Sequence, residues 1–493
     1  MLDPGVASSR YTKALTSAHL SAVLVFFFSL SMLPPAFVGL YFHEESVWAF
    51  LGTFILAGTV GLVGIGLTRG RKSTLKHRDG FLVLVTFWIL LSLIGALPFI
   101  ASQELSLSLT NALFEAISGI TTTGGSILTD IDGAPKAFLY YRAQLNFLGG
   151  LGIIVLAVAI LPITGIGGAQ LYQSEVPGPA KDEKITPRLA DTARRLWLIY
   201  VLLAVACYLS YWLAGMGWFD ALCHSLSTLS LGGFSTHGAS LGYYDSAAIE
   251  VVGGVFSILA ALNFALYFAA FQNRSLKPLT ANPEVRFFLF ILTLVVSFTC
   301  IYLYTTGTFS LDKALYHGFF QAASVMTDNG LGTHGYPHWP VSIALVLILS
   351  SFFGGCVGST CGGLKAMRCL MLYKQSVAEI DQSIHPRAIL RVKLGGKVVE
   401  PHIMQSVWAF FFAYISITIM FVVGLVLAGE DILTAFGTTA ACINNMGIGY
   451  GATAGGFNVL SDPGKWLMCL AMLFGRLEIF PILILMSRKT WSY

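Results

Sequence analysis

Charged residues are scarce in this sequence, and their scarcity excludes a soluble globular protein. Asp, Glu, Lys and Arg make up 11% of the 493 residues, whereas hydrophobic residues make up 55%. A soluble domain carries roughly 25% charged residues, because its surface has to be hydrated. The composition therefore predicts a protein that crosses the membrane several times.

Paired cysteines and clustered acids are also missing. The eight cysteines are scattered, with no C-x-x-C pair and no histidines at ligand spacing, which argues against a disulfide or zinc framework. The 25 acidic residues lie mostly at the ends of apolar runs, so no carboxylate cluster of the kind a membrane-embedded transferase needs is apparent. No segment has the pattern of a nucleotide-binding or nucleic-acid-binding motif. We therefore predict neither an enzyme nor a cofactor bound by this chain.

Long apolar runs are what the sequence does have. A helix needs about 20 apolar residues to cross a bilayer. Ten stretches meet this need, at 18–42, 47–68, 80–101, 138–163, 195–216, 247–271, 285–305, 341–363, 403–428 and 465–487. In this topology nearly all basic residues fall on one side, and the other side holds only Lys136, Arg142, Lys313 and Lys465. The positive-inside rule then places both termini in the cytoplasm of a multi-pass inner-membrane protein.

Four short segments between these spans are rich in small and hydroxyl residues, and each runs into a glycine. The segments end at Gly124, Gly232, Gly330 and Gly447, at intervals of about 100 residues. About a dozen residues before each glycine could form a short helix, at 108–120, 219–228, 311–326 and 431–443. Such a half-helix points its negative C-terminal end at the membrane centre, where it stabilises a cation. Packing between helices is the alternative interpretation of a glycine in a span.

The spacing divides the chain into an N-terminal two-helix domain and four pore repeats. We place the domain at 1–79 and the repeats at 80–180, 181–275, 276–395 and 396–493. A fourfold repeat of span, re-entrant segment and span lets one polypeptide build what a tetrameric cation channel builds from four. The predicted fold is an all-α membrane protein with ten transmembrane helices, eight of them around a central pore.

These segments resemble the pore loops of the TrkH family, the membrane subunits of bacterial Trk potassium uptake systems within the TrkH/KtrB/Trk superfamily. The resemblance rests on Thr-Thr-Thr-Gly at 121–124, Ser-Leu-Gly-Gly-Phe-Ser-Thr-His at 230–237, Thr-Asp-Asn-Gly at 327–330 and Asn-Asn-Met-Gly at 444–447. It covers essentially the whole chain, including the two extra N-terminal spans.

The resemblance implies a potassium selectivity filter made of backbone carbonyls. The carbonyls would belong to Thr122, Thr123, Ser230, Leu231, Asp328, Asn329, Asn445 and Met446, and Gly124, Gly232, Gly330 and Gly447 would allow the turn. Only the first loop keeps threonines at both positions before its glycine. The Asp328 side chain has two possible roles: it attracts cations at the filter, or it belongs to a hydrogen-bond network behind the filter.

A glycine-rich segment interrupts the span after the third pore loop. It contains Gly354, Gly355, Gly358, Ser359, Thr360, Gly362 and Gly363 and is followed by Lys365. It is not a phosphate-binding loop, because no strand precedes it and the spacing to the lysine differs. It is either a cytoplasmic helix end or a flexible loop beneath the filter, and the resemblance implies that it is the gate.

Arg476 is the one basic residue deep in a predicted span, and such residues usually face a cavity or a partner. Either it pins helices through Glu478 or backbone carbonyls, or it places a positive charge on the ion path. The resemblance favours the second role. His224, His237, His334 and His338 lie on different outer loops without ligand spacing, and we interpret them as lining the mouth.

The chain is therefore expected to take up potassium through a gated, channel-like pore. An ion-coupled symporter, driven by H⁺ or Na⁺, stays open as the alternative. The resemblance further implies a homodimer in contact with membrane lipids and a TrkA-like cytoplasmic ring of regulatory subunits, on which NAD(H) or ATP would act.

Overall fold

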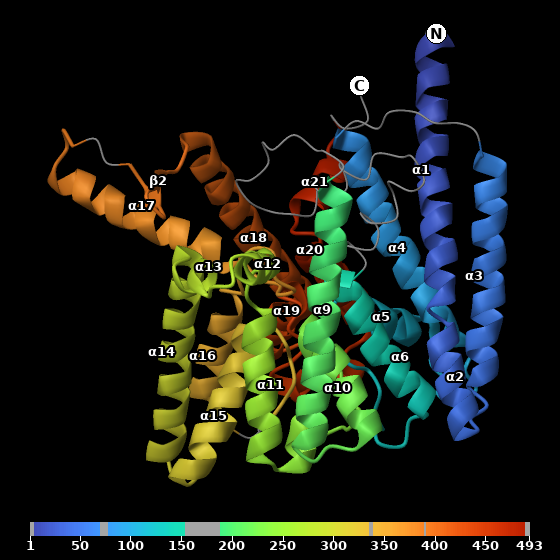
Figure 1. The fold of residues 1–493 in the computed structure, drawn as a ribbon, viewed down its shortest axis with the longest axis horizontal. Helices are drawn as coiled ribbons and strands as arrows, with labels where there is room; N and C mark the ends of the chain where they lie inside the picture. Colours follow the sequence, from blue (N-terminus) through green and yellow to red (C-terminus); the bar gives the residue numbers. More distant parts are fainter. Residues whose placement is uncertain (1–3, 70–76, 153–187, 335–338, 389–390, 489–493) are drawn as a thin grey trace.

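The computed structural model describes residues 4–69, 77–152, 188–334, 339–388 and 391–488, which form a helical bundle (Figure 1). Within these ranges the regular structure is helical, apart from one antiparallel hairpin of β1 (Lys393–Leu394) and β2 (Lys397–Val398). The predicted all-α membrane fold is confirmed.

The N-terminal helices form a hairpin at the edge of the bundle (Figure 1). They are α1 (Pro4–Leu30), its continuation α2 (Leu33–Phe42) and the antiparallel α3 (Val47–Thr68). Side chains of α3 such as Leu56, Val60 and Val63 are more than half exposed. Exposed apolar side chains along a long helix are what a lipid-facing surface requires.

Four repeats of one design follow. Each has a first long helix, then a short helix, and then another helix, which we call the second helix of the repeat. Their long and short helices are α4 (His77–Ala101) with α5 (Leu109–Ile120), α9 (Arg188–Leu213) with α10 (Trp218–Ser230), α14 (Pro283–Thr305) with α15 (Leu311–Met326), and α18 (Pro401–Leu427) with α19 (Ile432–Ile443). The short helices match the ranges predicted for pore helices within two residues. Polar caps begin two of them, because the Ser108 hydroxyl accepts from the Asn111 amide and the Asp431 carboxylate accepts from the amides of Leu433 and Thr434.

The second helix of each repeat is short or broken. These helices are α6 (Lys136–Phe147) with η1 (Leu148–Gly152), α11 (Ala247–Ala260) with α12 (Phe264–Gln272), α16 (Val341–Ser351), and α20 (Asp462–Arg476) with α21 (Phe480–Met486). The chain bends by 85° between α11 and α12 and by 112° between α20 and α21. The remaining elements are η2 (Ser240–Tyr244), α13 (Lys277–Thr280), α17 (Ala366–Ile384), η4 (Gly451–Gly455) and η5 (Phe457–Val459).

Among the described residues, six helices are long and apolar enough to cross a membrane, and the two bent pairs raise the number to eight. The other two predicted spans differ from continuous helices. The span at 138–163 runs beyond residue 152 into residues that the structure does not describe. The span predicted at 341–363 is helical only to Ser351, because the glycine-rich segment replaces its second half.

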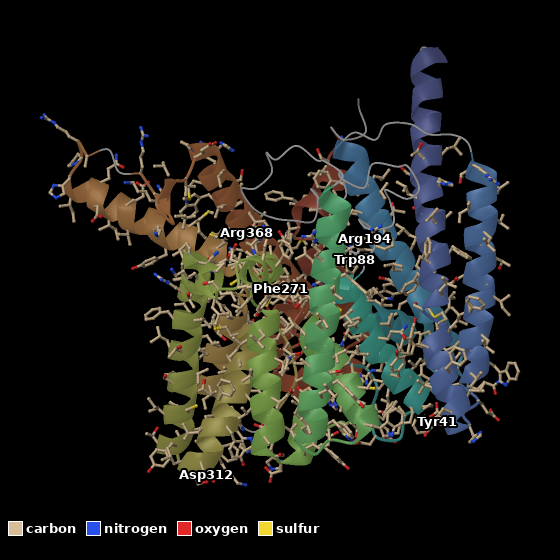
Figure 2. All side chains as sticks on the ribbon, viewed as in Figure 1. Tyr41, Trp88, Arg194, Phe271, Asp312 and Arg368 are labelled. Carbon is tan, nitrogen blue, oxygen red and sulfur yellow. The ribbon has the colours of Figure 1, made fainter. Side chains whose placement is uncertain are left out.

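Different elements lie at the two ends of the bundle. The start of α1, the end of α21 and the projecting α17 lie toward one end, whereas the turns that lead into the short helices lie at the other (Figure 1). In Figure 2, Arg194 and Arg368 lie in the half of the bundle where α1 begins, and Tyr41 and Asp312 lie at the opposite end. All four short helices therefore enter the bundle from the same end.

Candidate functional site

The backbone after each short helix adopts one shared conformation. A non-glycine residue has a positive φ, and the glycine two positions later has one as well. These pairs are Thr122 (56°) with Gly124 (78°), Leu231 (53°) with Gly233 (74°), Asp328 (59°) with Gly330 (77°), and Asn445 (56°) with Gly447 (77°). Left-handed conformations are strained for residues with a Cβ, so their recurrence at four matching positions indicates a functional constraint.

Matching hydrogen bonds fix these loops to the ends of the short helices. The residue between the two positive-φ positions donates its amide to a carbonyl in the last turn of the helix. The bonds are Thr123 to Ser118 (2.8 Å), Gly232 to Ser227 (2.9 Å), Asn329 to Ser324 (2.8 Å) and Met446 to Ala441 (2.8 Å). The dihedral angles and the hydrogen bonds thus define the same alignment of the four loops.

The four loops also meet one another in a closed ring. A Cβ on a glycine of one loop would collide with a carbonyl oxygen of the next loop. The colliding partners are Gly124 with Gly232, Gly233 with Asn329, Gly330 with Met446, and Gly447 with Thr123. The order of contacts runs from the first repeat through the second, third and fourth back to the first. We call Gly124, Gly233, Gly330 and Gly447 the ring glycines.

This geometry corrects the predicted turn residue of the second loop. Gly233 has the positive φ shared by the other three glycines, whereas Gly232, which was predicted to allow the turn, aligns with Thr123, Asn329 and Met446. Ser230 consequently lies one position too early and aligns with Thr121. The Gly-Gly dipeptide hid this shift in the sequence, because either glycine could take the turn.

Asparagine side chains of two of these loops donate to hydroxyls of neighbouring repeats. The Asn445 amide donates to the Thr123 hydroxyl (3.0 Å), and the Asn329 amide donates to Ser257 in the second repeat (2.6 Å). Asp328 is fully buried, and neither of its carboxylate oxygens has a hydrogen-bond partner in the described part of the chain. One predicted role for Asp328 was membership of a hydrogen-bond network behind the filter. Within the described residues, no hydrogen bond to its carboxylate supports that role.

The glycine-rich segment packs directly beneath these loops. The Cys356 amide donates to the carbonyl of Ala261 (2.8 Å), and the Val357 amide donates to the Glu284 carboxylate (2.7 Å). A Cβ on Gly362 would collide with the carbonyl of Asn444, which ends the fourth pore helix. Gly354, Gly358 and Gly363 have positive φ values. The segment is therefore a folded loop held against three repeats, not a simple helix end.

Arg476 reaches this loop from the end of α20. Its guanidinium donates to the carbonyls of Thr360 (3.1 Å), Gly150 (2.8 Å) and Gly149. It thereby joins the fourth repeat to the glycine-rich segment and to η1 in the first repeat. Backbone carbonyls are thus among its partners, as one of the two sequence interpretations proposed.

Two more cationic side chains lie at or next to the glycine-rich segment. The Lys365 ammonium donates to the Cys361 carbonyl (2.6 Å) within the glycine-rich segment, and Lys365 is nearly buried. Glu478 forms its ion pair with Arg368 (2.6 Å), whose guanidinium also covers the Phe410 ring. Arg476 and Lys365 thus both donate to carbonyls of the glycine-rich segment, whereas Glu478 offsets the charge of Arg368.

A histidine contacts two acids at the end of the bundle where the turns into the short helices lie. His237 contacts Asp132 (2.7 Å) and Asp220 (3.4 Å), so it joins the loops that follow the first and second filters. Burial raises the pKa of Asp132, but hydrogen bonds from His237 and the Gly238 amide outweigh it and hold the pKa below its ordinary value. Asp132 therefore stays charged and leaves a negative group at the mouth.

The other outer histidines do not converge on a site. His224 is buried and contacts Ser235, His334 is exposed, and His338 lies outside the described residues. Within the described residues no group of three His, Cys, Asp or Glu side chains could hold a metal ion.

Comparisons with known proteins agree with this architecture. The family model of TrkH, described as a cation transport protein, matches residues 48–493. The Trk system potassium uptake protein TrkG of Escherichia coli K12 is 52% identical over 473 residues, which cover 96% of this chain and 98% of that protein. The Trk system potassium uptake protein TrkH of Vibrio parahaemolyticus is 44% identical over 476 residues, covering 95% and 97% of the two chains. The crystal structure of the potassium transporter TrkH from Vibrio parahaemolyticus matches with a TM-score of 0.89 at 41% identity, over 97% of this chain and 99% of that one.

Proposed function

This chain belongs to the TrkH family of cation transport proteins, and from that premise we propose that it takes up potassium through a channel-like pore. The observation that carries the proposal is the closed ring of four filter loops with matching dihedral angles and hydrogen bonds. Potassium is the ion named for the relatives. A ring of carbonyl oxygens can replace the hydration shell of such an ion.

We infer the ion-facing carbonyls from the alignment of the loops. We place them on the two residues before each ring glycine: Thr122 and Thr123, Leu231 and Gly232, Asp328 and Asn329, and Asn445 and Met446. Three of these pairs agree with the sequence interpretation, and the second loop shifts by one residue. The pore helices point their C-terminal ends at the ring, which favours a cation at its centre.

We propose that the glycine-rich segment from Gly354 to Gly363 is the gate, with Arg476 as its latch. The segment lies beneath the filter and contacts three repeats, and its glycines allow it to refold without clashes. Arg476 stabilises the closed arrangement through three carbonyls and adds a positive charge below the filter. Opening requires both the hydrogen bonds and the charge to be displaced.

Regulation would come from a partner. We propose that the chain forms a homodimer in the inner membrane with both termini in the cytoplasm. A TrkA-like ring of nucleotide-binding subunits would dock at the cytoplasmic end and respond to NAD(H) or ATP. Helix α17 projects from the bundle (Figure 1), and the basic residues in and beyond it support this orientation. We propose that they form the docking surface.

A flux assay on purified protein in liposomes tests the transport mode. If the pore is channel-like, a potassium gradient across the liposome membrane is expected to be enough to drive rubidium uptake, with no need for a pH or sodium gradient. The pore is also expected to discriminate against sodium. Uptake that requires an inward proton or sodium gradient would instead establish the symporter. Equal conduction of potassium and sodium would refute the filter assignment.

A further inference from the structure

Each repeat holds the loop that follows its filter with a buried polar side chain at the same position of the pore helix. These side chains are Glu115, His224, Gln321 and Thr438, which align when the ring glycines are superposed in sequence. Their partners in the same repeat are the Ile127 amide (3.0 Å), the Ser235 hydroxyl (2.9 Å), the Thr333 amide (2.9 Å) and the Thr453 hydroxyl (2.7 Å). Four different polar residues, one on each pore helix, thus form a polar shell around the periphery of the filter.

At the boundary between the first and second repeats this shell contains a buried ion pair. Arg142 of α6 donates to Glu115 (2.7 Å), and both side chains are at most 1% exposed. The same guanidinium donates to the carbonyl of Ser235 (3.1 Å), two residues after the ring glycine of the second loop. Arg142 also covers the ring of Phe234 at 4.1 Å. One side chain therefore bridges the first pore helix and the loop that follows the second filter.

The boundary between the second and third repeats has a second buried pair. Glu250 of α11 contacts His317 of the third pore helix at 2.9 Å, and both side chains are fully buried. Glu250 also accepts from the hydroxyl of Thr333 (2.5 Å), on the loop after the third filter. As with Arg142, the second helix of one repeat is thereby tied to the filter loop of the next.

We propose that Glu115–Arg142 and Glu250–His317 are positioning residues that determine the selectivity of the filter. This inference rests on the proposed function. The four repeats have different sequences, so no exact symmetry fixes the width of the ring. Charge-assisted hydrogen bonds are stronger and more directional than neutral ones, and here they link adjacent loops through rigid helices. The two pairs hold the carbonyls of three consecutive loops at the spacing that suits potassium.

Substitutions that remove these ties test the proposal in the full-length protein. Arg142→Gln and Thr333→Val are expected to lower the ratio of rubidium to sodium flux in liposomes by about tenfold, because the loops can then move apart. Arg142→Lys keeps the charge beside Glu115 but cannot span both partners, so its selectivity should fall between that of the wild type and Arg142→Gln.

Matched controls separate positioning from general stability. Tyr141→Phe removes a buried hydrogen bond from the neighbouring residue of α6 to the carbonyl of Gly95, and Thr299→Val removes a buried threonine hydroxyl from α14. Both controls should keep wild-type selectivity, even where their melting temperatures fall.

The possible results are distinguishable. If Arg142→Gln and Thr333→Val conduct with wild-type selectivity, or lose thermal stability without a change in selectivity, the pairs are structural only and the inference is wrong. If the wild type itself does not discriminate between the two ions, the proposed function fails. If Arg142→Gln does not fold, Arg142→Lys and Thr333→Val carry the test, and wild-type selectivity in both overturns the inference.

Discussion

A side chain on a ring glycine has two separable costs, a strained backbone and a collision with the neighbouring loop. We expect Gly124→Ser and Gly233→Ser to reduce selectivity for potassium over sodium by about tenfold or more, because the carbonyls must tilt to make room. Gly429→Ser is the matched control, since Gly429 also has a positive φ (105°) but has no atom within 4 Å of an added Cβ. Rubidium and sodium fluxes of the three variants provide the measurement, and wild-type selectivity in both ring variants would refute the carbonyl ring.

The choice between Gly232 and Gly233 shows what a single sequence can settle at this scale. In three loops the glycine that the sequence assigned to the turn, Gly124, Gly330 or Gly447, has the positive φ. The first and second loops each have two adjacent glycines, and neither composition nor spacing shows which member of a pair takes the turn. Only the dihedral angles and the contact of Gly233 with the carbonyl of Asn329 decide the alignment.

Arg476 combines a charge with three carbonyl contacts, and substitutions separate the two. Arg476→Ala should raise the resting rubidium flux several-fold, because the closed loop loses its latch and the path loses a positive charge. Arg476→Lys keeps the charge but lacks the forked guanidinium that reaches the carbonyls of Thr360 and Gly150. Its flux should therefore lie between those of the wild type and Arg476→Ala. Flux and melting temperature are measured on the same samples. A fall in melting temperature without any gain in flux would leave Arg476 a structural tie only.

At the scale of elements, the proposed gate is a short segment that replaces the second half of a predicted span. Deleting Gly355 to Ser359 removes the backbone contacts of Cys356 and Val357 with the second and third repeats. We expect the deletion to raise rubidium flux and to weaken its dependence on the cytoplasmic partner, while selectivity stays unchanged because the filter loops are untouched. A folded deletion variant that conducts less than the wild type would favour a structural role for the segment.

The sequence predicted helices more reliably than their interruptions. The pore helices were located within two residues, because an apolar run, a capping residue and a following glycine mark their limits. The breaks after α11 and α20 were not predicted, since hydropathy stays high across them and the bend depends on packing against other repeats. The glycine pairs at 354–363 were the exception, and they correctly indicated where a span is interrupted.

At the scale of the whole molecule, four unequal repeats form one ring through contacts that cross their boundaries. The sequence did not identify the partners of Glu115 and Glu250, because these partners lie 27 and 67 positions away in the chain. Their pairing with Arg142 and His317 appears only when adjacent repeats are packed together. The ring could thus be anticipated from the repeat pattern, whereas the shell that supports it could not.

The end of the bundle from which α17 projects offers a last test, which concerns the assembly. Helix α17 projects from the bundle (Figure 1). Beyond it, Arg387, Arg391 and Lys393 are exposed. Exposed charges of one sign steer and strengthen association with an acidic surface, and salt screens them. Replacing the three residues by Glu should weaken binding of a TrkA-like partner about tenfold at low salt, with a smaller difference at high salt, because the attraction is electrostatic. Replacing them by Gln should have an intermediate effect, and neither variant should alter potassium over sodium selectivity, since the filter lies at the other end. Binding affinities measured across a salt series decide the matter: wild-type affinity of the Glu variant at every salt concentration would exclude this surface from docking.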